Sequence, residues 1–110
     1  MEKLELIVKT LDDKKGINIK VLEIGDITSI ADYFVICEGT SNTHVRALSE
    51  EVEFKLREAG IEPRQIEGRA SGWILLDYHD VIVHVFTADQ REYYNLEKLW
   101  ADARIAEIDV

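Results

Sequence analysis

The chain has little cysteine, little proline, no long apolar run and a deficit of basic residues. Its single cysteine, Cys37, excludes an internal disulfide and a zinc site built from several cysteines. No stretch approaches the roughly 18 uninterrupted apolar residues of a membrane-spanning helix. The first six residues carry charges throughout, which is not the pattern of a signal peptide. We therefore expect a cytoplasmic protein that does not enter a membrane.

Basic residues are outnumbered, with 13 Lys and Arg against 22 Asp and Glu, for a net charge of -9. Nucleic-acid binders normally carry a basic stripe that displaces counterions from phosphates. The basic residues of this chain are scattered, so direct nucleic-acid binding is disfavoured. The charge permits a basic protein partner.

What the chain does have is enough apolar material for a core. Its 110 residues predict one domain, spanning residues 1–110. A chain of this length buries about 60–68% of its unfolded surface. The hydrophobic content of 46% agrees with a globular fold rather than with disorder.

Apolar periodicity predicts helices interrupted by strands. Residues 2–15 form an amphipathic helix that Gly16 ends, and residues 17–24 form a strand. A connector over residues 27–32, with a helical turn at its centre, leads to a second strand over residues 33–38. That strand is nearly apolar on both faces, which places it in the middle of a covered sheet.

The second half of the chain repeats this alternation. Ser41 is a helix N-cap, and Gly60 with Pro63 ends that helix. A short edge strand and a hairpin follow. Thr87 with Gln90 predicts a capping box for one last helix, whose core positions are Leu96, Leu99 and Trp100. The order α-β-β-α-β-β-β-α predicts an α/β (mixed α+β) fold, with one mixed sheet of about five strands flanked by helices.

The hairpin over residues 72–86 organises the chain. Two apolar runs flank four more polar residues, and a turn centred on Tyr78–His79 places Asp77 opposite Asp80 and Trp73 opposite His84. Side chains alternate along strands, so one face is aliphatic and the other is mixed. Opposed carboxylates repel by roughly 0.2–1 kcal/mol. The mixed face is therefore either a functional surface or a polar turn that happens to carry two acids.

Several catalytic readings are weak. The junction over residues 37–44 resembles an anion site at a helix N-terminus but lacks the glycines and lysine of a P-loop. A nucleotidyltransferase holds magnesium with acids that alternate on one strand, whereas Asp77 and Asp80 are three residues apart. Cys37 lies in an apolar strand as a core residue, and His84 is interpreted as a structural histidine. We expect no enzyme, no metal and no cofactor.

The chain resembles the ribosomal silencing factor family (RsfS, or Iojap-related). The match runs from the first helix to Trp100 through several ordered motifs. These motifs lie at residues 32–41, 44–45, 72–78, 80–86 and 94–100. The family usually has glycine at the position of His79, where a left-handed backbone costs histidine roughly 1 kcal/mol.

The resemblance implies a non-enzymatic translation repressor with a nucleotidyltransferase-like fold that lacks the catalytic acids. Such a protein binds the large ribosomal subunit through its fourteenth ribosomal protein and blocks joining of the small subunit. Organellar relatives assist ribosome assembly, so a role as a large-subunit assembly factor is the alternative.

The resemblance and the mixed face together predict the partner-binding residues. An acidic and aromatic patch suits a basic protein surface. We assign this role to a set of hairpin residues and their neighbours, namely Trp73, Asp77, Tyr78, Asp80, Glu67 and Ser71. A homodimer through a sheet edge or through the Trp73 face is also left open.

Overall fold

A six-stranded mixed sheet forms the centre of the molecule. The computed structural model describes residues 2–69 and 71–106. The strands lie in the order β3-β4-β5-β2-β1-β6. Their bounds are β1 Ile17–Glu23, β2 Tyr33–Gly39, β3 Gln65–Glu67, β4 Trp73–Asp77, β5 Val81–Thr87 and β6 Arg104–Ala106. β2 and β5 pair in parallel and every other pair is antiparallel. The expected mixed sheet is confirmed, with β2 in its interior.

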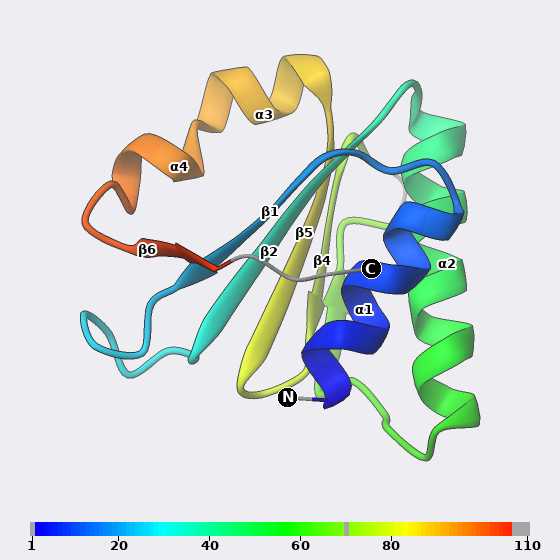
Figure 1. Cartoon of the computed structure of the whole chain (residues 1–110). Helices are drawn as coiled ribbons and strands as arrows, with labels where there is room; N and C mark the ends of the chain where they lie inside the picture. Colours follow the sequence, from blue (N-terminus) through cyan, green and yellow to red (C-terminus); the bar gives the residue numbers. More distant parts are fainter. Residues whose placement is uncertain (1, 70, 107–110) are drawn as a thin grey trace.

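Helices cover both faces of the sheet. α1 (Glu2–Asp13) and α2 (Asn42–Glu58) pack on one face, and the shorter α3 (Ala88–Tyr94) and α4 (Leu96–Leu99) lie on the other (Figure 1). Buried side chains accordingly form one core under α1 and α2 and a second core under α3 and α4. No helix in the described part of the chain is long and apolar enough to cross a membrane.

The ends of the first two helices follow local chemistry. The Ser41 hydroxyl accepts the backbone N–H of His44 at 3.1 Å, and Gly60 has φ +80°, so both expected caps are confirmed. The end of α1 differs, because Lys15 rather than Gly16 takes the left-handed conformation, with φ 65°. Gly16 is needed for space instead, since a Cβ there would lie 2.5 Å from the Cys37 sulfur.

The C-terminal region departs from the single helix that was expected. Asn95, with φ 44°, breaks the segment into α3 and α4. Thr87 holds the N-cap position without a side-chain cap bond, so the capping box is not formed. Trp100 and Leu96 pack partly against the second core as expected, but Leu99 is 72% exposed and is not a core residue. The chain then adds β6, an unpredicted strand, to β1.

The hairpin register differs from the predicted one by two residues. Trp73 lies opposite Phe86 rather than His84, and Asp77 lies opposite Ile82 rather than Asp80. The turn is centred one position later than expected, since the Tyr78 N–H donates to the Val81 carbonyl at 2.9 Å. A shift of two residues preserves the alternation, so the aliphatic and mixed faces contain the residues that were predicted.

Candidate functional site

Asp77 and Asp80, the predicted acidic pair of the turn, each contact a different basic side chain of the protein. Asp77 is 4% exposed, and its carboxylate accepts from the Arg64 guanidinium at 2.7 Å and from the His79 N–H at 2.9 Å. Asp80 instead accepts from the Lys3 ammonium at 2.6 Å. The predicted repulsion between Asp77 and Asp80 is therefore wrong, because each carboxylate has its own cation.

Burial and ion pairing shift the pKa values of two side chains in the turn. Burial alone would raise the pKa of Asp80, but the hydrogen bond and charge of Lys3 hold that pKa below its ordinary value. Tyr78 is fully buried on the aliphatic face, and burial raises the pKa of its phenol to about 12. His79 adopts the left-handed conformation with φ 73°. Asp77 and Tyr78 therefore do not lie on the surface, and their predicted contact with a partner would need the turn to open.

Aromatic side chains gather on the other face, where β4 meets α3. We call Trp73, Tyr93 and Tyr94 the aromatic patch. The Tyr94 ring lies 4.5 Å from the Trp73 ring between centroids, and Tyr93 meets Tyr94 edge-on at 5.0 Å. Tyr93 is 80% exposed and Tyr94 is 45% exposed. The patch thus runs from solvent to the half-buried indole, which stacks on Phe86 at 5.0 Å.

The sequence prediction included Trp73 but missed both tyrosines. Tyr93 lies in the last turn of α3, just before the break at Asn95, and faces solvent. Two adjacent tyrosines, which cannot both face a core from a helix, were the available signal.

The remaining predicted residues border Trp73. Glu67 is exposed and pairs with Leu75, so it lies on the same sheet face as the indole. The Ser71 hydroxyl contacts the backbone of Trp73 on both sides, donating to its carbonyl at 2.9 Å and accepting its N–H at 3.3 Å. Gly68 closes this turn with φ +80°, where a Cβ would collide with the Trp73 carbonyl oxygen. The structure therefore brings Trp73, Glu67 and Ser71 together.

The indole is also held from below by a buried histidine. The Trp73 Nε1–H donates to Nδ1 of His84 at 3.1 Å. His84 is 4% exposed, and burial lowers the pKa of its imidazole to about 4. The ring is therefore neutral at physiological pH.

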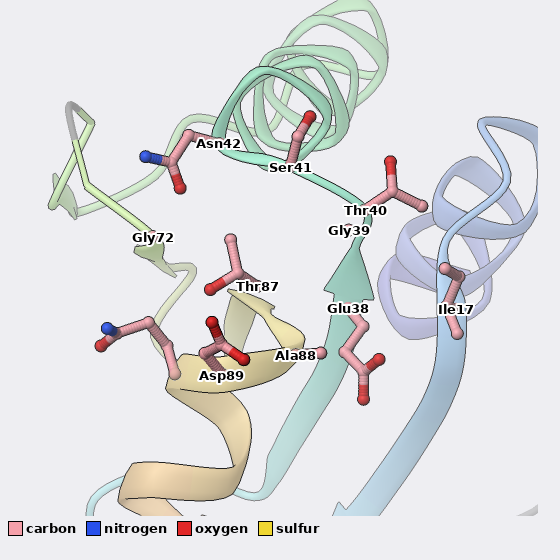
Figure 2. A pocket seen from close by; sticks show the side chains of 11 residues that line it. Ile17, Glu38, Gly39, Thr40, Ser41, Asn42, Gly72, Thr87, Ala88 and Asp89 are labelled. Atoms are coloured by element: carbon pink, nitrogen blue, oxygen red, sulfur yellow. The ribbon is translucent and has the colours of Figure 1, made fainter.

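A separate cavity lies at the ends of the two parallel strands. It measures about 650 Å³ and opens between the start of α2 and the start of α3. Figure 2 shows Asn42, Thr87 and Asp89 around it, with Glu38 further along β2. Of the described residues that line it, none is basic, and the Glu38 carboxylate already contacts Arg91 at 3.3 Å. The helix start favours an anion, but the carboxylates oppose one.

Across residues 2–69 and 71–106, no group of three or more His, Cys, Asp or Glu side chains is arranged to hold a metal ion. The Cys37 thiol is fully buried, and burial raises its pKa to about 12, which disfavours the nucleophilic thiolate. The fold and site together define a mixed α+β protein that exposes an aromatic patch on the sheet face covered by α3 and α4.

Comparisons with known proteins identify the family. The family model described as "Ribosomal silencing factor during starvation" matches residues 1–110. The ribosomal silencing factor RsfS of Halalkalibacterium halodurans is 45% identical over 109 residues, covering 98% of this chain and 93% of that protein. The Bacillus subtilis RsfS is 43% identical, covering 96% and 91%. The chain belongs to the ribosomal silencing factor family.

More distant relatives and solved structures agree with this family assignment. The mouse "Mitochondrial assembly of ribosomal large subunit protein 1" is 30% identical, and the match covers 96% of this chain and 50% of that protein. A crystal structure from Chromobacterium violaceum superposes with a TM-score of 0.89 at 35% identity, covering 99% and 91% of the two chains. One from Bacillus halodurans gives 0.86 at 42% identity, covering 97% and 98%.

Proposed function

We propose that the protein represses translation in the cytoplasm by binding the large ribosomal subunit through its fourteenth ribosomal protein. Its bulk there blocks joining of the small subunit. Membership of the ribosomal silencing factor family supports a role at the ribosome. The partner and the steric block go beyond the family name and need their own tests.

The observation that carries the proposal is the exposed aromatic patch. Tyr93 and Tyr94 lie in water, although burying such rings is favourable, and they continue into the half-buried Trp73. Aromatic residues dominate protein interfaces because they bury a large area at a small cost in conformational entropy. Glu67 and Ser71 lie at the rim of the same surface, where polar groups set orientation.

Charge supports a basic protein partner. The chain carries a net charge of -9 and is repelled by ribosomal RNA. At physiological salt that repulsion is screened beyond about 8 Å, so a basic protein surface that projects from the RNA can still attract the chain. Complementary charge then raises the association rate.

Co-sedimentation with isolated large subunits tests the binding surface. Tyr93→Ala removes an exposed ring, so it should leave the fold intact while weakening binding by roughly 10-fold or more, as interface aromatics do. Phe54→Ala is the matched control, because Phe54 is 53% exposed on α2, in the opposite layer of the molecule. Equal binding by the two variants would place the contact surface elsewhere.

Subunit joining tests the mechanism. Large subunits saturated with the protein should form fewer full ribosomes when small subunits are added, and Tyr93→Ala should restore joining. Binding without any loss of joining would contradict the steric block. The isolated fourteenth ribosomal protein should bind the wild type and compete with the large subunit for it.

A second candidate is assistance in large-subunit assembly, because the mouse relative is named for that role in mitochondria. An assembly factor should bind immature large subunits better than mature ones, and its loss should slow their maturation during growth. A repressor should show its largest effect on mature subunits.

We further propose that the protein works without catalysis. Purified protein with magnesium or manganese should neither hydrolyse nor transfer nucleotides. Turnover that survives repurification and disappears in Asp89→Asn, at the cavity of Figure 2, would contradict this proposal.

A further inference from the structure

Trp73 and His84 are joined diagonally across the β4–β5 pair. Trp73 lies opposite Phe86 and His84 lies opposite Leu75, yet the indole reaches back so that Nε1–H donates to Nδ1 of His84. The Phe34 ring lies edge-on to the imidazole at 4.8 Å, and the Phe86 ring lies nearly parallel to it at 6.0 Å. The imidazole is therefore fixed by neighbouring rings and the indole is fixed by the imidazole.

The direction of this hydrogen bond assigns the tautomer. An indole nitrogen only donates, so Nδ1 of His84 must accept, and the hydrogen of the neutral ring then resides on Nε2. Nε2 is buried and has no hydrogen-bond partner among the described residues. An unpaired buried donor is unfavourable, and an apolar residue of similar shape would avoid it. Packing alone therefore does not explain a histidine here, whereas the acceptor at Nδ1 does.

We propose that His84 is the positioning residue of the aromatic patch. Through Nδ1 it turns the Trp73 N–H inward, so that a partner meets a preset hydrocarbon surface of the indole rather than a hydrogen-bond donor. This inference rests on the proposed function for its consequence in binding, and on geometry alone for the orientation of Trp73. A ring held in place before contact loses less freedom on binding.

Variants of His84 distinguish the roles of the two imidazole nitrogens. His84→Asn keeps an acceptor the same number of bonds from the backbone as Nδ1 and removes Nε2. His84→Leu fills the site without any acceptor. Nuclear magnetic resonance of the indole N–H groups reads out the orientation directly, with Trp73→Phe assigning the signal against that of Trp100. We expect the Trp73 N–H to stay protected from exchange in His84→Asn and to exchange rapidly in His84→Leu.

Affinity for large subunits gives the second measurement, on variants shown to be folded by thermal melts. His84→Leu should bind roughly 2- to 12-fold more weakly, the loss expected when one side chain must be ordered on contact, and His84→Asn should restore binding. Unchanged protection in His84→Leu, or failure of His84→Asn to restore it, overturns the positioning role. If the Trp73 N–H exchanges rapidly in His84→Leu while the affinity for large subunits is unchanged, the proposed effect of His84 on binding is overturned. A wild type that does not bind subunits contradicts the proposed function, while the resonance measurement still decides the role of His84.

Discussion

At the scale of single residues, His84 should make stability depend on pH. Its pKa falls from 6.5 to about 4 because burial penalises the imidazolium. Between those values the unfolded chain binds a proton that the folded chain refuses, so the free energy of unfolding rises with pH across this window. The lost stability at the acidic end is about 3 kcal/mol by linkage. Chemical denaturation at a series of pH values measures it.

The control for this prediction is His84→Asn, which cannot titrate. Burial alone would raise the pKa values of Glu53, Asp80 and Glu97, but their neighbouring cations hold these values below the ordinary ones. Protonating these carboxyl groups therefore also destabilises the fold as acid is added. Their effect begins at about pH 5 and persists in the variant. Identical pH profiles for wild type and variant between pH 4.5 and 6.5 would contradict the assignment.

Gly16 and Cys37 should show coupled effects on stability. A Cβ at residue 16 would lie 2.5 Å from the Cys37 sulfur and 2.9 Å from the Leu11 carbonyl oxygen. Gly16→Ala should therefore destabilise the fold by about 1–3 kcal/mol, as overpacking does. Cys37→Ala should cost roughly 1 kcal/mol because it opens a small cavity in the core.

The double variant distinguishes steric conflict from a backbone effect. Removing the sulfur should relieve part of the cost of Gly16→Ala, so the two changes should be less destabilising together than their sum. Urea denaturation of the four proteins measures this coupling. Strict additivity would show that the conflict at Leu11 dominates. Ribosome binding by Cys37→Ala should be unchanged.

Residue-level features with local causes were predictable, and those with distant partners were not. The Ser41 cap needs only His44, and the burial of Cys37 follows from its apolar strand. The charges of the turn depend on Lys3, which is 77 positions from Asp80 in the sequence. No local pattern reveals such a partner, so the turn was predicted to be a free acidic patch.

At the scale of elements, two ion pairs anchor the β4–β5 turn. Arg64, which lies just before β3, ties it to that segment, and Lys3 ties it to α1, where the ammonium also donates to the Tyr78 carbonyl at 3.1 Å. Asp77→Asn should destabilise the fold by about 1–3 kcal/mol, because a buried charged hydrogen bond is lost. Asp80→Asn should cost at most about 1 kcal/mol, because its pair is partly exposed and screened.

Thermal melts of the two single variants check this order. A double asparagine variant that is as stable as the wild type would restore the idea that the two acids repel each other. The asparagine variants should change the affinity for large subunits only slightly, because neither carboxylate lies in the aromatic patch.

Element existence was predictable from periodicity, whereas register and the chain end were not. The sheet faces came out correctly because a register error of two residues keeps every side chain on its side. The register itself depends on His79, whose left-handed backbone moves the turn by one position. β6 has three residues, too few for a periodic signal, and it forms only because α4 returns the chain to β1.

At the scale of the whole molecule, the two layers carry different surfaces. α1 and α2 form one outer layer, and α3 lies on the opposite side of the sheet (Figure 1). α3 carries Tyr93 and Tyr94 of the aromatic patch. The body measures 33 × 33 × 26 Å. Two ribosomal surfaces that must touch cannot do so across a bound body of that thickness. The proposed block therefore needs no conformational change in the protein.

Net charge should act on the rate of encounter, and the patch should act on residence time. Wild-type affinity for the isolated basic ribosomal protein should fall as salt is added, mainly through slower association. Glu67→Gln and Asp12→Asn each remove one negative charge from exposed positions, Glu67 beside Trp73 and Asp12 on α1 in the far layer. The two variants therefore change the net charge equally but at opposite sides of the molecule.

The two variants should separate long-range steering from local contact. Both should slow association slightly at low salt, and this difference from the wild type should vanish at physiological salt. Only Glu67→Gln should also speed dissociation, by roughly 1.5- to 5-fold, the range for a partly exposed charge contact. Surface plasmon resonance with immobilised partner measures both rates. Faster dissociation of Asp12→Asn would place the basic partner on the α1 and α2 layer. An affinity that does not respond to salt would show that charge does not contribute to recognition.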